Sequence, residues 1–278
     1  MEWFWLVVAA IGAGVGTGLA GLSAATLMVP ILIVLCPSFE GEKGTYQATA
    51  IALASDILGS AVATRTYAKH KNIDLKRGWV VMACILIMCV VGSYVAFLIG
   101  NFTLGSMTLF ITFFIGIRFI IKPETKRKDN VGKGTGLTGK EVLISVICGT
   151  CIGFGTGFIG SGGGMTMLIV FTLLLGMDIK TAVGTSTFIM TFTALTASVC
   201  HIIIHPAIIM EKWLMMIVCM AVATVASLIS ARFANRVSNK VVGRVNGVLL
   251  TVLGAFLIIL KFWDYIIQIP FLSKWLGK

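Results

Sequence analysis

The stretch GFGTGFIGSGGG, residues 153–164, decides the fold because it interrupts an apolar run that extends from residue 142 to residue 176. As one helix this run would be about 50 Å long, whereas the hydrocarbon core of a bilayer is about 30 Å thick. Each glycine also costs a helix about 1 kcal/mol relative to alanine, and Gly162, Gly163 and Gly164 are consecutive. We therefore predict either a steeply tilted broken helix or two half-length helices that meet inside the membrane.

A related stretch, GVGTGLAG at residues 14–21, aligns without gaps on residues 153–160 and lies in a second over-long apolar run, residues 3–36. Farther along the chain, residues 47–50 align on residues 183–186. Because the order of these blocks is the same in both halves, the sequence predicts an internal duplication. We divide the chain into a first transmembrane repeat at residues 1–122, a polar cytoplasmic linker at 123–141 and a second transmembrane repeat at 142–278.

The composition places most of the protein surface in lipid. Hydrophobic residues make up 58% of the chain, charged residues make up 12%, and the mean hydropathy is +1.00. A water-soluble domain needs about a quarter of its residues charged. The chain is therefore predicted to be an integral membrane protein of a bacterial-type cytoplasmic (inner) membrane. The net charge of +11 comes from short segments between apolar runs, so it does not indicate a nucleic-acid partner.

Six further apolar runs have the length of ordinary membrane-spanning helices. They lie at residues 45–67, 78–100, 104–121, 181–204, 213–234 and 241–262. The predicted fold is all-α, with two repeated halves. Each half contains a glycine-broken long segment, interpreted as a helical hairpin, followed by three transmembrane helices.

The basic residues favour an inverted arrangement of the two halves over a parallel one. If each long segment enters the membrane and returns, the basic clusters at residues 65–77, 122–140 and 232–244 all lie in the cytoplasm, as the positive-inside rule favours. If each long segment crosses the membrane once, the halves are parallel and the cluster at residues 232–244 lies outside. We predict the inverted arrangement, with both termini outside.

Broken segments at corresponding positions of two repeats are typical of a transporter's binding site. Freed backbone N–H groups and helix N-termini attract anions, and no lysine lies near the centre of a predicted span. The predicted substrate-binding residues are Thr17, Gly18, Gly21, Ser23, Thr49, Gly157, Gly160, Ser161, Gly162, Gly163, Gly164, Thr185 and Ser186. In the alternative interpretation, glycines at four-residue spacing, such as Gly14 and Gly18, only let helices pack closely.

The two glycine-rich blocks, the Gly184-Thr185-Ser186 sequence that opens the next helix and the duplicated chain resemble the TauE/SafE sulfite exporter family, also called the toluene-sulfonate uptake permeases. The resemblance implies a secondary transporter for a small sulfur-containing anion, such as sulfite or an organosulfonate like sulfoacetate. We expect the protein to have no cofactor, no metal site and no enzymatic activity.

Three ionisable residues are candidates for roles beyond the glycine blocks. Asp56 is the one acidic residue deep inside a predicted span, so it is a candidate for proton coupling, although it could equally hold neighbouring helices together. Arg65 and His201 occupy equivalent positions near helix ends and are possible anion contacts or solvated side chains. The expected partners are the anion, coupling protons and membrane lipid.

Two other classes of function stay open. One is an anion channel through the same region. The other is an intramembrane serine hydrolase in which Ser23 acts as nucleophile and His201 as base. Cys148 and Cys151 form the only close cysteine pair, and they are interpreted either as small hydrophobic residues or as a redox pair.

Overall fold

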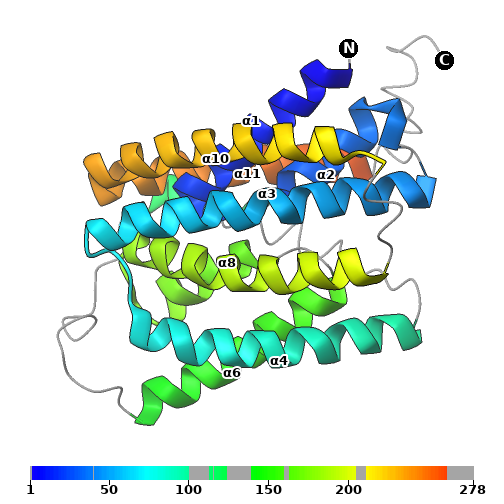
Figure 1. The fold of residues 1–278 in the computed structure, drawn as a ribbon. Helices are drawn as coiled ribbons and strands as arrows, with labels where there is room; N and C mark the ends of the chain where they lie inside the picture. The colour runs from blue at the N-terminus through cyan, green and yellow to red at the C-terminus, as the bar shows by residue number, and fades with distance from the viewer. Residues whose placement is uncertain are drawn as a thin grey trace, which may run out of the picture.

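The computed structural model describes residues 2–39, 41–99, 113–114, 116–123, 139–159, 163–204 and 211–261. All the regular structure in these residues is helical (Figure 1). The elements are α1 (Glu2–Ala20), α2 (Ala24–Leu35), the short turn η1 (Pro37–Phe39), α3 (Gly41–Lys69), α4 (Leu75–Ile99), α6 (Gly139–Ile159), α7 (Gly164–Ile169), the π-helical turn η2 (Val170–Leu174), α8 (Ile179–Ile204), α10 (Trp213–Arg236) and α11 (Asn239–Lys261). Residues 116–121 are also helical. The predicted all-α fold is confirmed for the described residues.

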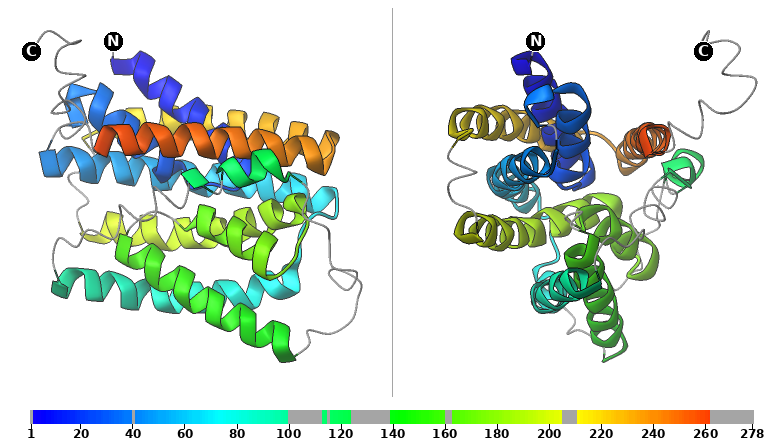
Figure 2. Two further views of the ribbon diagram at one scale, coloured as in Figure 1. Left: turned by 180° about the vertical axis from the view of Figure 1, so that it is seen from behind. Right: turned by 90° about the vertical axis from the view of Figure 1, so that its right-hand side faces the viewer.

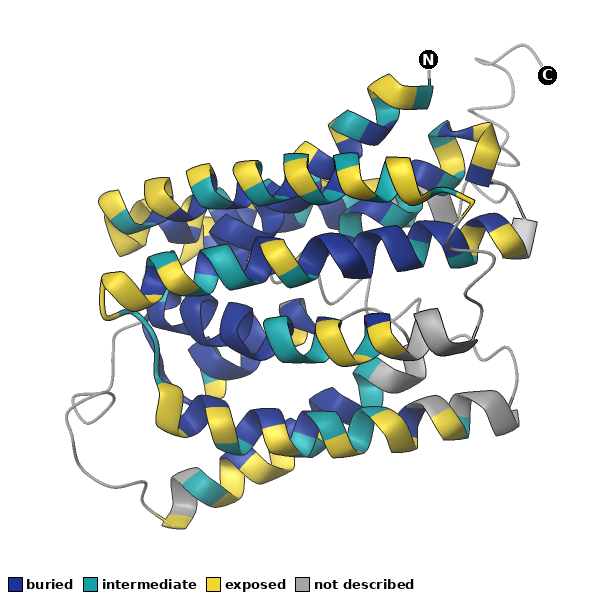
Figure 3. Ribbon diagram, in the orientation of Figure 1, coloured by how far each residue is buried: buried dark blue, intermediate teal, exposed yellow. Residues whose placement is uncertain are grey.

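Four of these helices are long and apolar enough to cross a membrane: α1, α4 over Leu75–Gly92, α8 over Ile179–Val199, and α10. Large apolar side chains face outward on them. Ile87 of α4 is 66% exposed, and Ile229 of α10 is 62% exposed. Figure 3 shows the buried residues gathered where helices face one another and the exposed residues on the outside of the bundle. Exposed apolar side chains are unfavourable in water, so this outer surface fits a lipid environment.

Both over-long apolar runs are broken where their glycines gather. The first run ends α1 at Ala20 and resumes as α2, and the second ends α6 at Ile159 and resumes as α7. One glycine at each break has a left-handed backbone, Gly21 with a φ of 63° and Gly163 with a φ of 64°. Glycine adopts this conformation without the steric cost that a Cβ atom imposes, which allows the chain to leave the helix there. The predicted interruption of both runs is confirmed.

The helices are arranged around α8, which lies between α3 and α4 (Figures 1 and 2). On one side of the bundle α6 packs against α4. On the other side α10 packs against both α1 and α3. The short α7 returns alongside α8. Helices from the first and second halves of the sequence are therefore intermixed throughout the bundle.

Contacts at the helix ends give the relative directions of the helices. Near the start of α3, Lys43 Nζ donates to Glu211 Oε1 at 2.8 Å. Just beyond its end, Asn72 Nδ2 donates to Asn235 Oδ1 at 2.7 Å. Helices α3 and α10 therefore run parallel. Helix α8 runs antiparallel to α3, since Thr191 contacts the middle of α3 while the start of α8 lies at its end.

Glycine allows the closest helix contacts in the bundle. A Cβ atom built on Gly14 would lie 2.3 Å from the backbone O of Ala223 on α10, and one built on Gly18 would lie 2.4 Å from the O of Ser227. Real Cβ atoms do not approach backbone atoms so closely. Gly14 and Gly18 thus permit the packing of α1 against α10, as the alternative interpretation of their spacing expects.

Candidate functional site

The two helix breaks touch each other. A Cβ atom built on Gly164, at the start of α7, would lie 2.4 Å from the backbone O of Gly21 and 3.0 Å from the backbone N of Ser23. A Cβ atom built on Gly21 would lie 2.2 Å from Ser186 Oγ on α8. We call Gly21, Ser23, Gly164 and Ser186 the break junction. Four of the predicted site residues, two from each half of the chain, are in contact there.

Asp56 of α3 reaches the break junction and caps α2. The residue is 2% exposed. One carboxylate oxygen accepts a hydrogen bond from Ser23 Oγ, and the other accepts one from Ala24 N at 2.6 Å. Ser23 is itself the N-cap residue of α2. A carboxylate is favourable at this position because the first N–H groups of a helix are unpaired and the helix dipole is positive there. The protein's own anion therefore occupies the N-terminus of α2.

The remaining predicted residues of the first half are Thr17, Gly18 and Thr49. The hydroxyl of Thr17 lies 2.9 Å from the O of Leu22, so it closes the end of α1. Gly18 packs against α10, and its carbonyl accepts a hydrogen bond from Tyr67 Oη at 2.9 Å. The hydroxyl of Thr49 donates to the backbone of its own helix, α3. Thr17 and Gly18 therefore support the helices around the break junction, whereas Thr49 bonds within α3 near its start.

The second break is described only in part. Gly160, Ser161 and Gly162 lie outside the described residues, and Gly157 lies in the last turn of α6. Gly163 is the N-cap residue of α7, and a Cβ atom built on it would lie 2.2 Å from Thr156 Oγ1. The hydroxyl oxygen of Thr156 is buried and has no hydrogen-bond partner among the described residues.

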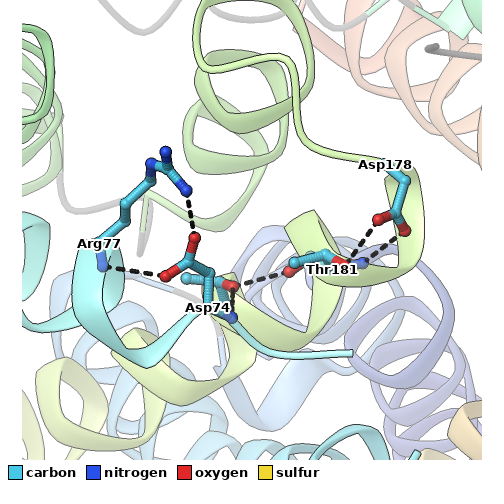
Figure 4. Close-up of polar contacts among 5 residues, drawn as sticks. Asp74, Arg77, Asp178 and Thr181 are labelled. Atoms are coloured by element: carbon cyan, nitrogen blue, oxygen red, sulfur yellow. Dashed lines mark hydrogen bonds and ion pairs between the residues drawn. The ribbon is translucent and has the colours of Figure 1, made fainter. Parts of the chain in front are cut away.

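Thr185 belongs to a polar network at the start of α8. Figure 4 shows this network around Asp74, Arg77, Asp178 and Thr181. Its hydroxyl donates to Thr181 O at 2.7 Å and accepts a hydrogen bond from Asp74 N at 3.0 Å. Asp178 caps α8 by accepting from Thr181 N and Oγ1, and Asp74 caps α4 in the same way through Arg77 N. The Arg77 guanidinium also pairs with the Asp74 carboxylate. The network fixes the connection between α3 and α4 against the start of α8.

The other predicted ionisable and sulfur-containing residues lie apart from this network. Arg65 is exposed on the last turns of α3 and lines a pocket shared with α10. His201 lies in α8, but its side chain is outside the part that the structure describes. Cys148 is buried and Cys151 is exposed, and both are free thiols. Ser23, the nucleophile of the hydrolase alternative, donates its hydroxyl hydrogen to Asp56.

The charges around the break junction come from very few groups. Among the described residues, Arg77 is the only buried lysine or arginine, and it is paired with Asp74. In the same residues, no group of three or more histidine, cysteine, aspartate or glutamate side chains is arranged to hold a metal ion. An anion at the break junction would have to be bound by backbone N–H groups and hydroxyls.

Two features of the site were not predicted from the sequence. Thr156 aligns with Thr17 in the internal repeat, and that correspondence was the available signal for it. Asp74 and Arg77 are three residues apart at the start of a helix, a spacing that suits N-capping. Their link to Thr185 joins segments far apart in the sequence, so only the three-dimensional structure reveals it.

Comparison with known proteins agrees with this architecture. The family described as Sulfite exporter TauE/SafE matches residues 6–257, which include both breaks and all the described helices apart from their extreme ends. A protein of Bacillus subtilis (strain 168) named Probable membrane transporter protein YunE is 26% identical over 216 residues, which cover 73% of this chain and 79% of that protein. The resemblance noted in the glycine blocks is confirmed. The chain belongs to the sulfite exporter TauE/SafE family and is an integral membrane transporter of that family.

Proposed function

We propose that the protein is a secondary transporter of a small sulfur-containing anion, such as sulfite or an organosulfonate, and that the anion binds at the break junction. The observation that carries this proposal is the contact between Gly164 and the segment from Gly21 to Ser23, which joins the breaks of the two halves. The family's description as sulfite exporters supports the choice of anion. The N-termini of α2 and α7 supply backbone N–H donors. The Ser186 hydroxyl donates to Val183 O of its own helix at 2.9 Å, and rotation of this hydroxyl turns its hydrogen toward the anion.

Asp56 gives this site a means of coupling to protons. Its carboxylate accepts hydrogen bonds from Ser23 Oγ and Ala24 N, which are donors that a substrate oxyanion would use. A substrate anion and an ionised Asp56 therefore compete for the same donors and repel each other. Protonation of Asp56 removes the repulsion and weakens its hold on those donors, so proton uptake favours anion binding.

The same proposal includes two inverted repeats, at residues 1–122 and 142–278, joined by a polar linker. Helices α3 and α8, which contain the aligned residues 47–50 and 183–186, run antiparallel. In a parallel duplication, α10 would run in the same direction as α4, which is opposite to the direction of α3. Instead, α10 runs parallel to α3. These directions support the inverted arrangement, which is common among secondary transporters with a site at the repeat interface.

Cysteine labelling tests the inverted arrangement. In a cysteine-free background, Lys43→Cys should react with an impermeant thiol reagent in intact cells, whereas Lys240→Cys should react only after lysis. Lys43 pairs with Glu211 at one end of α10, and Lys240 follows the other end of the same helix. In the parallel arrangement both positions lie outside, so labelling of both variants in intact cells would exclude inverted repeats.

Removal of the Ser186 hydroxyl tests the position of the anion. We expect Ser186→Ala to weaken sulfite or sulfoacetate binding about tenfold, since a hydrogen bond to a charged group is worth about 1.5 kcal/mol or more. Saturable uptake into proteoliposomes should fall in parallel. Thr224→Val is the matched control, because the Thr224 hydroxyl also donates to its own helix, at 2.6 Å from Met220 O, but lies on α10. Equal affinities in the two variants would place the anion elsewhere.

A further inference from the structure

A basic pocket lies between the last turns of α3 and α10. Its volume is about 680 Å³. Five of the side chains that line it are basic, and no acidic side chain lines it: Arg65, Lys69 and His70 on α3, and Arg232 and Arg236 on α10. All five residues are exposed on the outside of the bundle. The pocket is therefore separate from the buried break junction.

The positive charges of this pocket are not neutralised within the described part of the protein. The ion pairs found there are Lys43–Glu211 and Asp74–Arg77, and neither involves a residue of the pocket. Arginine and lysine keep their charge at neutral pH, so four positive charges surround one cavity. Such a cluster favours a bound anion with several oxygen atoms, and arginine binds phosphate oxygens in a bidentate manner.

The wall of the pocket becomes apolar toward the middle of the membrane. Val62 and Leu228 line it one turn before Arg65 and Arg232. The outward face of α10 continues in the same direction with Val225, which is 57% exposed. This order of apolar and then basic side chains along the bundle matches the acyl chains and phosphate of a phospholipid. A free inorganic anion would gain nothing from the apolar part.

We propose that this pocket binds the head group of an anionic phospholipid, with its acyl chains along the outward faces of α3 and α10. Basic pockets between membrane-spanning helices are suited to such head groups. Next to the pocket, Asn72 Nδ2 donates to Asn235 Oδ1 and joins the same two ends. A lipid phosphate that bridges Arg65 and Arg232 adds a further link between these ends of α3 and α10, so lipid binding stabilises the fold.

Lipid binding is measured on purified protein in a neutral detergent, by thermal unfolding and native mass spectrometry with added phosphatidylglycerol. The unmodified protein should bind the lipid and unfold at a higher temperature, whereas phosphatidylcholine should have little effect. The Arg65→Gln/Arg232→Gln variant should lose at least about tenfold in affinity, because each cation near an anionic lipid contributes about fivefold. The Lys240→Gln/Arg244→Gln control removes two exposed charges from the adjacent start of α11 and should keep full affinity.

Three results would overturn the proposal. The first is equal phosphatidylglycerol affinity in the pocket variant and the unmodified protein. The second is an equal loss in the control, which would indicate a general charge effect. The third is stabilisation by inorganic phosphate alone as large as that by the lipid, which would identify a free-anion site. If the pocket variant does not fold, Arg65→Lys/Arg232→Lys replaces it, and that variant should retain part of the binding because the charges remain.

Discussion

Asp56→Asn is expected to strengthen anion binding at neutral pH by at least about tenfold and to abolish flux driven by a pH gradient. The asparagine keeps an oxygen that accepts the hydrogen bond of Ala24 N, but it removes the negative charge from the N-terminus of α2. Two negative charges about 5 Å apart repel each other by roughly 3 kcal/mol at an effective dielectric constant of about 20, which explains the direction and size of the effect. Binding titrations at several pH values and proteoliposome flux measure the two parts of this prediction.

Comparison of Asp56→Ala with Asp56→Asn separates coupling from a purely structural role. Alanine leaves the hydroxyl of Ser23 and the N–H of Ala24 without their buried acceptor, which costs about 1–3 kcal/mol of stability for each group. If Asp56 only holds α3 to α2, then Asp56→Asn should leave both the anion affinity and the pH dependence of transport unchanged. That result would refute the coupling mechanism while leaving the position of the anion open to the Ser186 test.

Gly18→Ala is expected to destabilise the protein by about 3 kcal/mol, whereas Gly12→Ala on the same helix should not. A Cβ atom at Gly18 would lie 2.0 Å from Ser230 Oγ and 2.4 Å from Ser227 O, so α1 and α10 would have to separate. Overpacking of this kind typically costs about 1–3 kcal/mol. At Gly12 nothing lies within 4 Å of the added atom, and alanine should raise helix stability by up to about 1 kcal/mol. Thermal unfolding in detergent compares the two variants.

This comparison also decides between the two interpretations of Gly18. If Gly18→Ala unfolds at the same temperature as the unmodified protein but no longer binds the anion, Gly18 acts directly in the binding site. The contacts with α10 lead us to expect the opposite result, a loss of stability that accompanies any loss of binding. Anion titration of the folded fraction of each variant provides the second measurement.

The sequence predicted the helix breaks because their signals are local. The length of each apolar run and the local density of glycine are properties of neighbouring residues, and a lipid-facing surface follows from composition alone. The repeat then indicated that the two breaks have corresponding roles. Gly21, Ser23, Gly164 and Ser186 were all among the predicted residues, and the structure brings them together.

The partners of individual side chains could not be predicted because they depend on contacts between distant segments. Asp56 was recognised as unusual, but its two donors lie more than thirty residues earlier in the chain, at the start of α2. Thr185 and Ser186 are neighbours in the sequence, yet they face different structures on a helix that turns about 100° per residue. Thr185 bonds to Asp74, while Ser186 contacts Gly21.

The packing of α10 between α1 and α3 has a consequence for the way the chain is made. Helices α1 and α3 are synthesised early, but the surface that covers Gly14 and Gly18 belongs to a helix near the other end of the chain. Until α10 leaves the ribosome and enters the bilayer, lipid must cover these glycine faces in its place. The contacts of α1 and α3 with α10 therefore form late, whereas those among α1, α2 and α3 can form as soon as the first half is inserted.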